Sequence, residues 1–191
     1  MQSFIPSFDA SQQAWRRDAW LAFLVVATVG MSLLFTCAMP FAALATAVAM
    51  TSNRKQTIGF MLAACVLNQL VGLAFRGYPH EISTLLWAGV FAACTVASAV
   101  AASAVVEATR ARFSPFMVMA ATLAAAFVAF QFVLLLANLT PLGTLASFAL
   151  ATKAKIALIN IAAMGAICLA NRIVVAIGFL SAPQRPAAVM A

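Results

Sequence analysis

An apolar stretch without a charged residue, from Ala19 to Thr51, most constrains how this chain can fold. As a single helix it would be about 50 Å long, whereas the hydrocarbon core of a bilayer is only about 30 Å thick. Pro40 lies inside the stretch, where proline removes a backbone donor and clashes with the preceding turn. We therefore expect a full membrane-spanning helix over 19–38, followed by a shorter returning helix over 40–51.

Four further apolar segments are long enough to cross a membrane, which takes about 20 apolar residues. They are 57–75, 83–105, 113–137 and 155–180. The last contains Arg172, a residue type that can snorkel from a helix end to the interface. The segment 141–152 is too short to cross unaided. We interpret it as a re-entrant or interfacial piece, and the alternative is an extra span that moves the carboxyl terminus to the other side.

The composition agrees with a chain that has lipid as its solvent. The sequence is 65% hydrophobic and only 8% charged, whereas soluble proteins average about 25% charged residues. A net charge of +7 would suggest nucleic-acid binding in a soluble protein, but here the basic residues form short clusters between apolar runs. We expect an all-α, polytopic protein with six transmembrane helices in a bacterial inner membrane, and no nucleic-acid partner.

The basic residues also predict the orientation, because Lys and Arg concentrate in cytoplasmic loops. With a cytoplasmic amino terminus, the inner side receives Arg16, Arg17, Arg54, Lys55, Arg110 and Arg112, and the outer side receives Arg76, Lys153 and Lys155. Six spans place both termini in the cytoplasm. The expected organisation is a cytoplasmic segment over 1–18, one transmembrane domain over 19–180 and a disordered cytoplasmic tail over 181–191. The first apolar run exceeds a signal-peptide core, so we expect it to be retained.

The outward loop "RGYPHEIS", from Arg76 to Ser83, holds the single His and the single Tyr of the sequence. One interpretation is a hairpin loop in which Gly77 and Pro79 make the turn and Tyr78 anchors at the interface. In the other, Tyr78, His80 and Glu81 line the mouth of an outward cavity, with His80 as a metal ligand or hydrogen-bond partner. The segment from Asn138 to Lys155 is the other polar outward region and converges on the same side.

Polar side chains inside the spans are few. Amides in hydrocarbon are costly unless they bond across helices or face a cavity, and the simplest interpretation of Asn68, Gln69, Gln131, Asn160 and Asn171 is that they join helices. The four cysteines lack a C-x-x-C spacing, so we expect small buried hydrophobic residues rather than metal ligands.

Known catalytic patterns are absent from the sequence. It has no H-E-x-x-H motif, no Gly-rich phosphate loop, no paired carboxylates and no Ser-His-Asp set. Carboxylates are also scarce within the spans, which argues against a proton-driven or cation-driven pump. We therefore expect a protein that is not an enzyme.

The pattern "NQLVGLAFRGYP", from Asn68 to Pro79 and followed by Trp87, resembles small proteobacterial membrane proteins of cobalamin uptake. With the size and topology, it resembles the substrate-binding S-components of energy-coupling-factor vitamin transporters, including solitary ones. The resemblance implies that loops near 39–41, 76–83 and 138–155 hold the vitamin, with His80 as an axial ligand to the cobalt of a bound corrinoid. The implied substrate-binding residues are Asn68, Arg76, Tyr78, His80, Glu81, Asn138, Lys153 and Lys155.

The resemblance also bears on partners. Many S-components dock onto a coupling subunit through an Ala-x-x-x-Ala face on the first helix, and 19–36 has no such pair. Either the protein works with an energy-coupling transmembrane subunit and ATPases, or it acts alone. Cobalamin would be the transported ligand, with no cofactor expected. The alternative function is a non-transporting membrane subunit or assembly factor whose polar loop contacts a partner protein.

Overall fold

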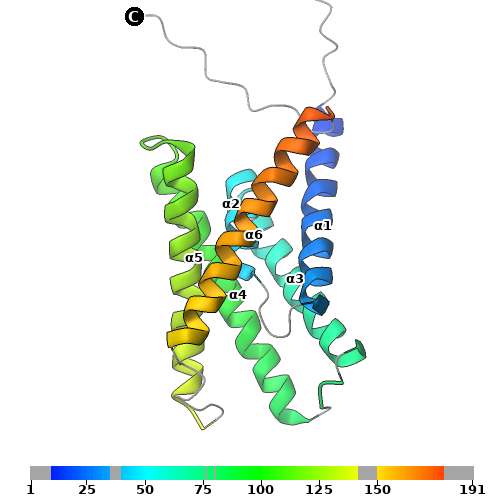
Figure 1. Ribbon diagram of the computed structural model, residues 1–191, viewed down its shortest axis with the longest axis vertical. Coiled ribbons are helices and arrows are strands. Elements are labelled where there is room, and N and C mark those ends of the chain that lie inside the picture. The colour runs from blue at the N-terminus through cyan, green and yellow to red at the C-terminus, as the bar shows by residue number, and fades with distance from the viewer. Residues whose placement is uncertain (1–9, 35–39, 76, 80, 142–149, 179–191) are drawn as a thin grey trace, which may run out of the picture.

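The computed structural model of the protein describes residues 10–34, 40–75, 77–79, 81–141 and 150–178. Within these residues all regular structure is helical (Figure 1). The helices are α1 (Ala10–Leu34), α2 (Phe41–Thr51), α3 (Arg54–Phe75), α4 (Ile82–Thr109), α5 (Pro115–Asn138) and α6 (Leu150–Ala176). Four of them, α3 to α6, are long and apolar enough to cross a membrane. The protein is therefore an all-α membrane protein.

The short helix predicted after Pro40 is confirmed, since α2 begins at Phe41 and ends at Thr51. Other helices extend beyond their apolar runs, because a helix need not end where the hydrocarbon ends. Thus α1 begins at Ala10 instead of 19, and α6 begins at Leu150 instead of 155. The end of the uncertain segment 141–152 therefore belongs to α6, while 142–149 and the predicted tail over 181–191 lie outside the described residues.

Side chains near the helix ends explain where several helices begin. Ser114 Oγ accepts a hydrogen bond from the Met117 amide at 3.4 Å, and Pro115 occupies the first turn of α5, where the missing amide proton costs nothing. Asn53 Oδ1 accepts from the Gln56 amide at 3.0 Å in the first turn of α3, as N-cap residues do. Gly77 adopts a φ of 64°, a left-handed conformation that favours glycine and reverses the chain after α3.

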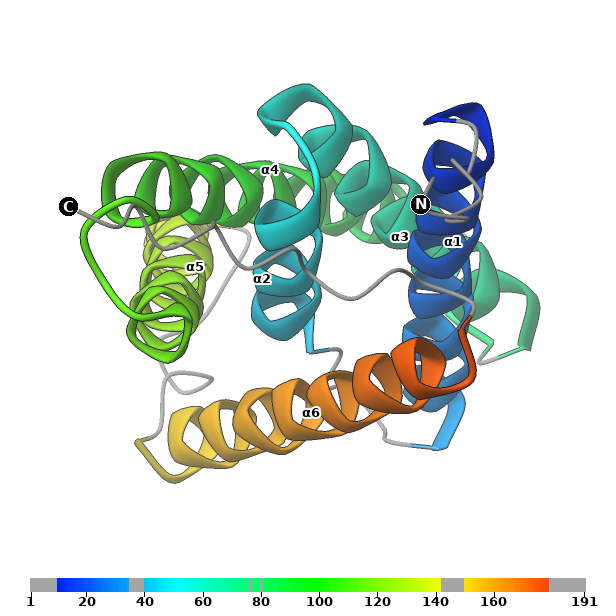
Figure 2. The same ribbon diagram turned by 90° about the horizontal axis from the view of Figure 1, so that it is seen from above.

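The short helix α2 lies at the centre of the bundle, in contact with the other five helices (Figure 2). Every residue from Phe41 to Ala49 is buried. The largest helix interface joins α4 and α5, where small residues such as Ala99 and Ala126 are fully buried and allow close backbone approach. Helix α6 makes its main contact with α2.

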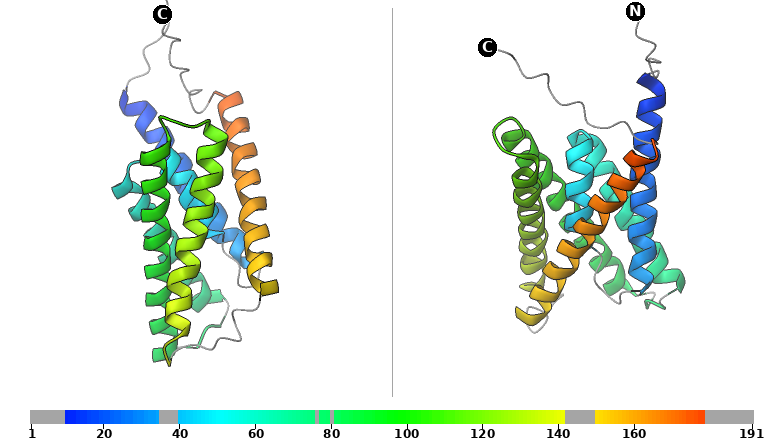
Figure 3. Two further views of the ribbon diagram at one scale, coloured as in Figure 1. Left: turned by 90° about the vertical axis from the view of Figure 1, so that its left-hand side faces the viewer. Right: turned by 45° about the horizontal axis from the view of Figure 1, so that its top comes forward.

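The two ends of the bundle, which Figure 3 shows from two sides, differ in their Lys and Arg residues. At one end, which we call the basic end, α1 begins, α6 ends, and the connections α2–α3 and α4–α5 lie; its cationic residues are Arg16, Arg17, Arg54, Lys55, Arg110, Arg112 and Arg172. At the opposite end lie the connections α3–α4 and α5–α6. Among the described residues that end has only Lys153 and Lys155 as Lys or Arg. The uneven distribution of Lys and Arg predicted from the sequence is therefore also found between the two ends of the bundle.

Hydroxyl groups inside the bundle are mostly bonded to their own helix. Thr46 donates to the Ala42 carbonyl at 2.8 Å and Thr122 to the Val118 carbonyl at 2.7 Å. Ser98 instead donates across to the Ala126 carbonyl of α5 at 3.0 Å. These bonds matter because an unpaired polar group in hydrocarbon costs several kcal/mol, on the order of a whole hydrogen bond.

Candidate functional site

The chain reversal after α3 includes a contact between Gly72 and Tyr78. The Tyr78 amide donates to the Gly72 carbonyl at 3.3 Å, and a Cβ on Gly72 would overlap the Tyr78 ring. The ring is half-buried and folds back on α3. Two residues of the "NQLVGLAFRGYP" pattern thus shape the loop together, because only glycine leaves room for the ring.

The other predicted residues near this loop come from α3 and from the start of α4. Glu81 precedes α4 and is exposed; its carboxylate accepts from Ser83 Oγ at 3.4 Å. Asn68 is half-buried on α3. Arg76 and His80 lie outside the described residues, so the predicted cobalt-ligating role of His80 stays a prediction.

The predicted residues of the α5–α6 region lie at the same end of the bundle (Figure 1). Asn138, at the end of α5, is buried and donates to the Leu134 carbonyl at 2.8 Å. Lys153, near the start of α6, donates from Nζ to Gln131 Oε1 of α5 at 2.8 Å. Lys155 is exposed. The predicted interhelical role of Gln131 is confirmed, and its partner is one of the predicted binding residues.

A chain of aromatic rings was not predicted. The Phe41 and Phe130 rings stack with centroids 5.7 Å apart and an interplanar angle of 19°. Phe130 also contacts Phe91 at 6.4 Å, and Phe91 contacts Trp87 at 6.2 Å. We call Phe41, Trp87, Phe91 and Phe130 the ring cluster. It joins the beginning of α2 to α4 and α5, in the half of the bundle toward the opposite end.

The ring cluster lies at the beginning of the central helix α2. α2 begins about halfway along the bundle (Figure 1), and its first residue, Phe41, belongs to the ring cluster. Asn160 of α6 reaches this point: its Oδ1 accepts from the Ala43 amide at 3.1 Å, and its Nδ2 donates to the Ile156 carbonyl at 2.9 Å. The side chain is 3% exposed. The predicted interhelical role of Asn160 is confirmed: its side chain accepts a hydrogen bond from the first turn of the short helix α2.

Sequence signals for the ring cluster existed but were weak. Trp87 and Phe91 are four residues apart, which places them on one helix face, and Trp87 belongs to the pattern quoted above. In a sequence with 15 Phe residues, nothing singles out Phe41 or Phe130 before the helices are placed.

The predicted burial of the cysteines is confirmed for Cys65 and Cys94. Cys65 and Cys94 are buried and free, and Cys168 is partly buried and free; Cys37 lies outside the described residues. Among the described residues no group of three His, Cys, Asp or Glu side chains could hold a metal ion.

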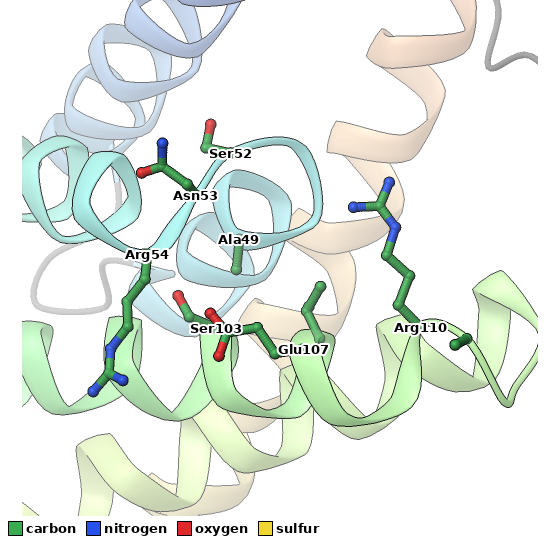
Figure 4. A pocket seen from close by; sticks show the side chains of 9 residues that line it. Ala49, Ser52, Asn53, Arg54, Ser103, Glu107 and Arg110 are labelled. Carbon is green, nitrogen blue, oxygen red and sulfur yellow. The ribbon is translucent and has the colours of Figure 1, made fainter.

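The basic end has a polar cavity of about 430 Å³ between α2, α3 and α4. Its charged lining residues are Arg54, Glu107 and Arg110, and Ser52, whose buried Oγ has no hydrogen-bond partner in the described structure, also lines it. Figure 4 shows the Glu107 and Arg110 side chains pointing away from each other. Within the described residues neither forms an ion pair.

Comparison with known proteins gave no match: no family model fits the chain, and neither a curated protein nor a solved structure matches it. Fold and site define the class as a small helical membrane protein with a short central helix.

Proposed function

We propose that the protein is an inner-membrane vitamin-binding and uptake protein of the S-component type, with cobalamin or a related corrinoid as its substrate. The observation that carries the proposal is the ring cluster at the beginning of the short central helix α2. In transporters, discontinuous helices that end near the bilayer midplane commonly line the substrate site. A broad planar macrocycle suits a site bordered by aromatic faces, which stack on other π-systems.

Polar residues near the ring cluster suit the amide side chains of a corrinoid. Lys153 and Gln131 bond to each other between α6 and α5 at 2.8 Å, and they supply a donor and an amide to a substrate with amide side chains. The loop with Tyr78 and Glu81 lies at the same end of the bundle. In the proposal, the loop covers the macrocycle, and the imidazole of His80 coordinates the cobalt of the substrate.

The first prediction concerns the colour of the purified protein. From cobalamin-fed cells the protein should retain a corrinoid through purification, and the bound ligand should be visible in the absorption spectrum. His80→Ala should shift that spectrum and weaken binding, because cobalt loses a nitrogen ligand. Tyr78→Phe should change both much less, since it keeps the ring that packs over Gly72.

The outcomes of this experiment separate two claims. A colourless wild-type protein that also fails to bind added cobalamin contradicts the vitamin function and favours a role in contacting a partner protein. A coloured wild-type protein with an unchanged spectrum in His80→Ala contradicts only the role of His80.

The second prediction concerns topology. A reporter fused after Ala191 should lie in the cytoplasm, because the basic end holds most of the described Lys and Arg residues and α6 ends there (Figure 3). A reporter inserted after Pro141 should lie on the other side of the membrane. A periplasmic carboxyl terminus contradicts the six-span topology.

A further inference from the structure

Two cavities meet between α5 and α6. The first, about 380 Å³, lies at the basic end and is bordered by α1, α2, α4, α5 and α6. The second, about 560 Å³, extends along α5 and α6 toward the level of Asn160. Met119, Met164 and Cys168 line both. We call the two cavities together the α5–α6 groove.

The lining of the groove is apolar except near its two ends. Phe116, Leu123 and Phe127 of α5 face Ile161 and Gly165 of α6 along the second cavity, with Asn160 at its far end. At the basic end the lining includes Arg110, Thr51 and Asn171. The groove is thus apolar along its length and has a cation at its mouth.

Arg110 lacks a neutralising partner within the described residues. The nearest acid in the sequence is Glu107 on α4, and its side chain points away from Arg110 (Figure 4), although both residues line the polar cavity. On the facing end of α6, Arg172 adds positive charge. The mouth of the groove is therefore complementary to an anion.

The length of the groove matches one leaflet of a bilayer. Its lining on α5 extends from Phe116 to Phe127, which is about 16 Å of helix at 1.5 Å per residue. Half of a hydrocarbon core about 30 Å thick is about 15 Å. An acyl chain in the groove would extend from the headgroup level to the bilayer midplane.

We propose that the α5–α6 groove binds an anionic phospholipid of the leaflet at the basic end. Its phosphate contacts Arg110, and one acyl chain lies between α5 and α6. The flexible thioethers of Met119 and Met164 adapt to the chain where the two cavities meet. This site is separate from the ring cluster and does not depend on the vitamin proposal.

The test uses the full chain in nanodiscs containing equal amounts of phosphatidylglycerol and phosphatidylcholine, followed by native mass spectrometry of the lipids that remain bound. The wild-type protein should retain phosphatidylglycerol in preference to phosphatidylcholine. Arg110→Gln should lower that preference about fivefold, because one basic residue near the membrane surface contributes about 1 kcal/mol to binding an anionic lipid. Arg112→Gln is the matched control, since Arg112 lines neither cavity, and it should keep the preference.

A second variant tests the acyl-chain part of the proposal. A Cβ on Gly165 meets no atom within 4 Å, so Gly165→Leu should fill the groove without a clash and remove the retained lipid. Gly89→Leu on α4 is the control, because Gly89 is also open and lines neither cavity. Equal lipid retention in Arg110→Gln and wild type contradicts the proposal. So does a protein dimer that Gly165→Leu dissociates, because a second copy would then occupy the groove.

Discussion

Replacing Asn160 with leucine is expected to destabilise the protein by about 1–3 kcal/mol, the usual cost of leaving a buried donor unpaired. Asn160 Oδ1 is the acceptor for the Ala43 amide in the first turn of α2, and no intrahelical acceptor exists for the first amides of a helix. Water cannot replace the lost oxygen, because Ala43 is fully buried at the centre of the bundle. Thermal unfolding in detergent should show the loss as a melting temperature lowered by roughly 5 °C.

The matched control makes the same change on the same helix. Asn171 is exposed on α6 and has no side-chain hydrogen bond among the described residues, so Asn171→Leu should alter the melting temperature little. Equal melting temperatures for the two variants would contradict the capping role of Asn160. A lower melting temperature of Asn160→Leu alone would show that a side chain from α6 stabilises the short helix α2.

The short helix α2 could be predicted from local sequence, but the side chain that caps it could not. Pro40 and the excessive length of the surrounding apolar stretch predict a short second helix, because both constraints act within a few turns. The acceptor of the Ala43 amide lies 117 residues away. Several amides in the spans could have had this role, and only the positions of α2 and α6 select Asn160.

In the candidate site, too, local features could be predicted from the sequence, whereas contacts between helices could not. The polar composition of the loop around Tyr78 predicted a candidate site there, but the overlap that a Cβ on Gly72 would make with the Tyr78 ring depends on the folded loop. The ring cluster was not predicted, because Phe41, Phe91 and Phe130 come from three helices and each looks like an ordinary lipid-facing residue in the sequence. Lys153 was predicted as a binding residue, but its bond to Gln131 depends on how α5 and α6 are placed.

Shortening Phe130 to alanine is expected to weaken corrinoid binding about 10-fold or more. Phe130 contacts two other rings of the cluster, Phe41 on α2 and Phe91 on α4. Aromatic contacts contribute about 0.5–1.5 kcal/mol each beyond the area they bury, and a tenfold change in affinity corresponds to about 1.4 kcal/mol. Titration of the purified protein with cobalamin, followed by absorption, measures the change.

The control for this change lies two residues further along the same helix. Phe132 is 59% exposed and belongs to no described ring pair, so Phe132→Ala removes the same ring from the surface of α5 and should keep the wild-type affinity. Phe130→Leu, which retains most of the volume but not the aromatic face, separates stacking from packing. If the aromatic face binds the macrocycle, Phe130→Leu should bind as weakly as Phe130→Ala while melting closer to wild type. If Phe130→Leu restores full affinity, the ring cluster only packs the bundle, and the corrinoid must bind elsewhere.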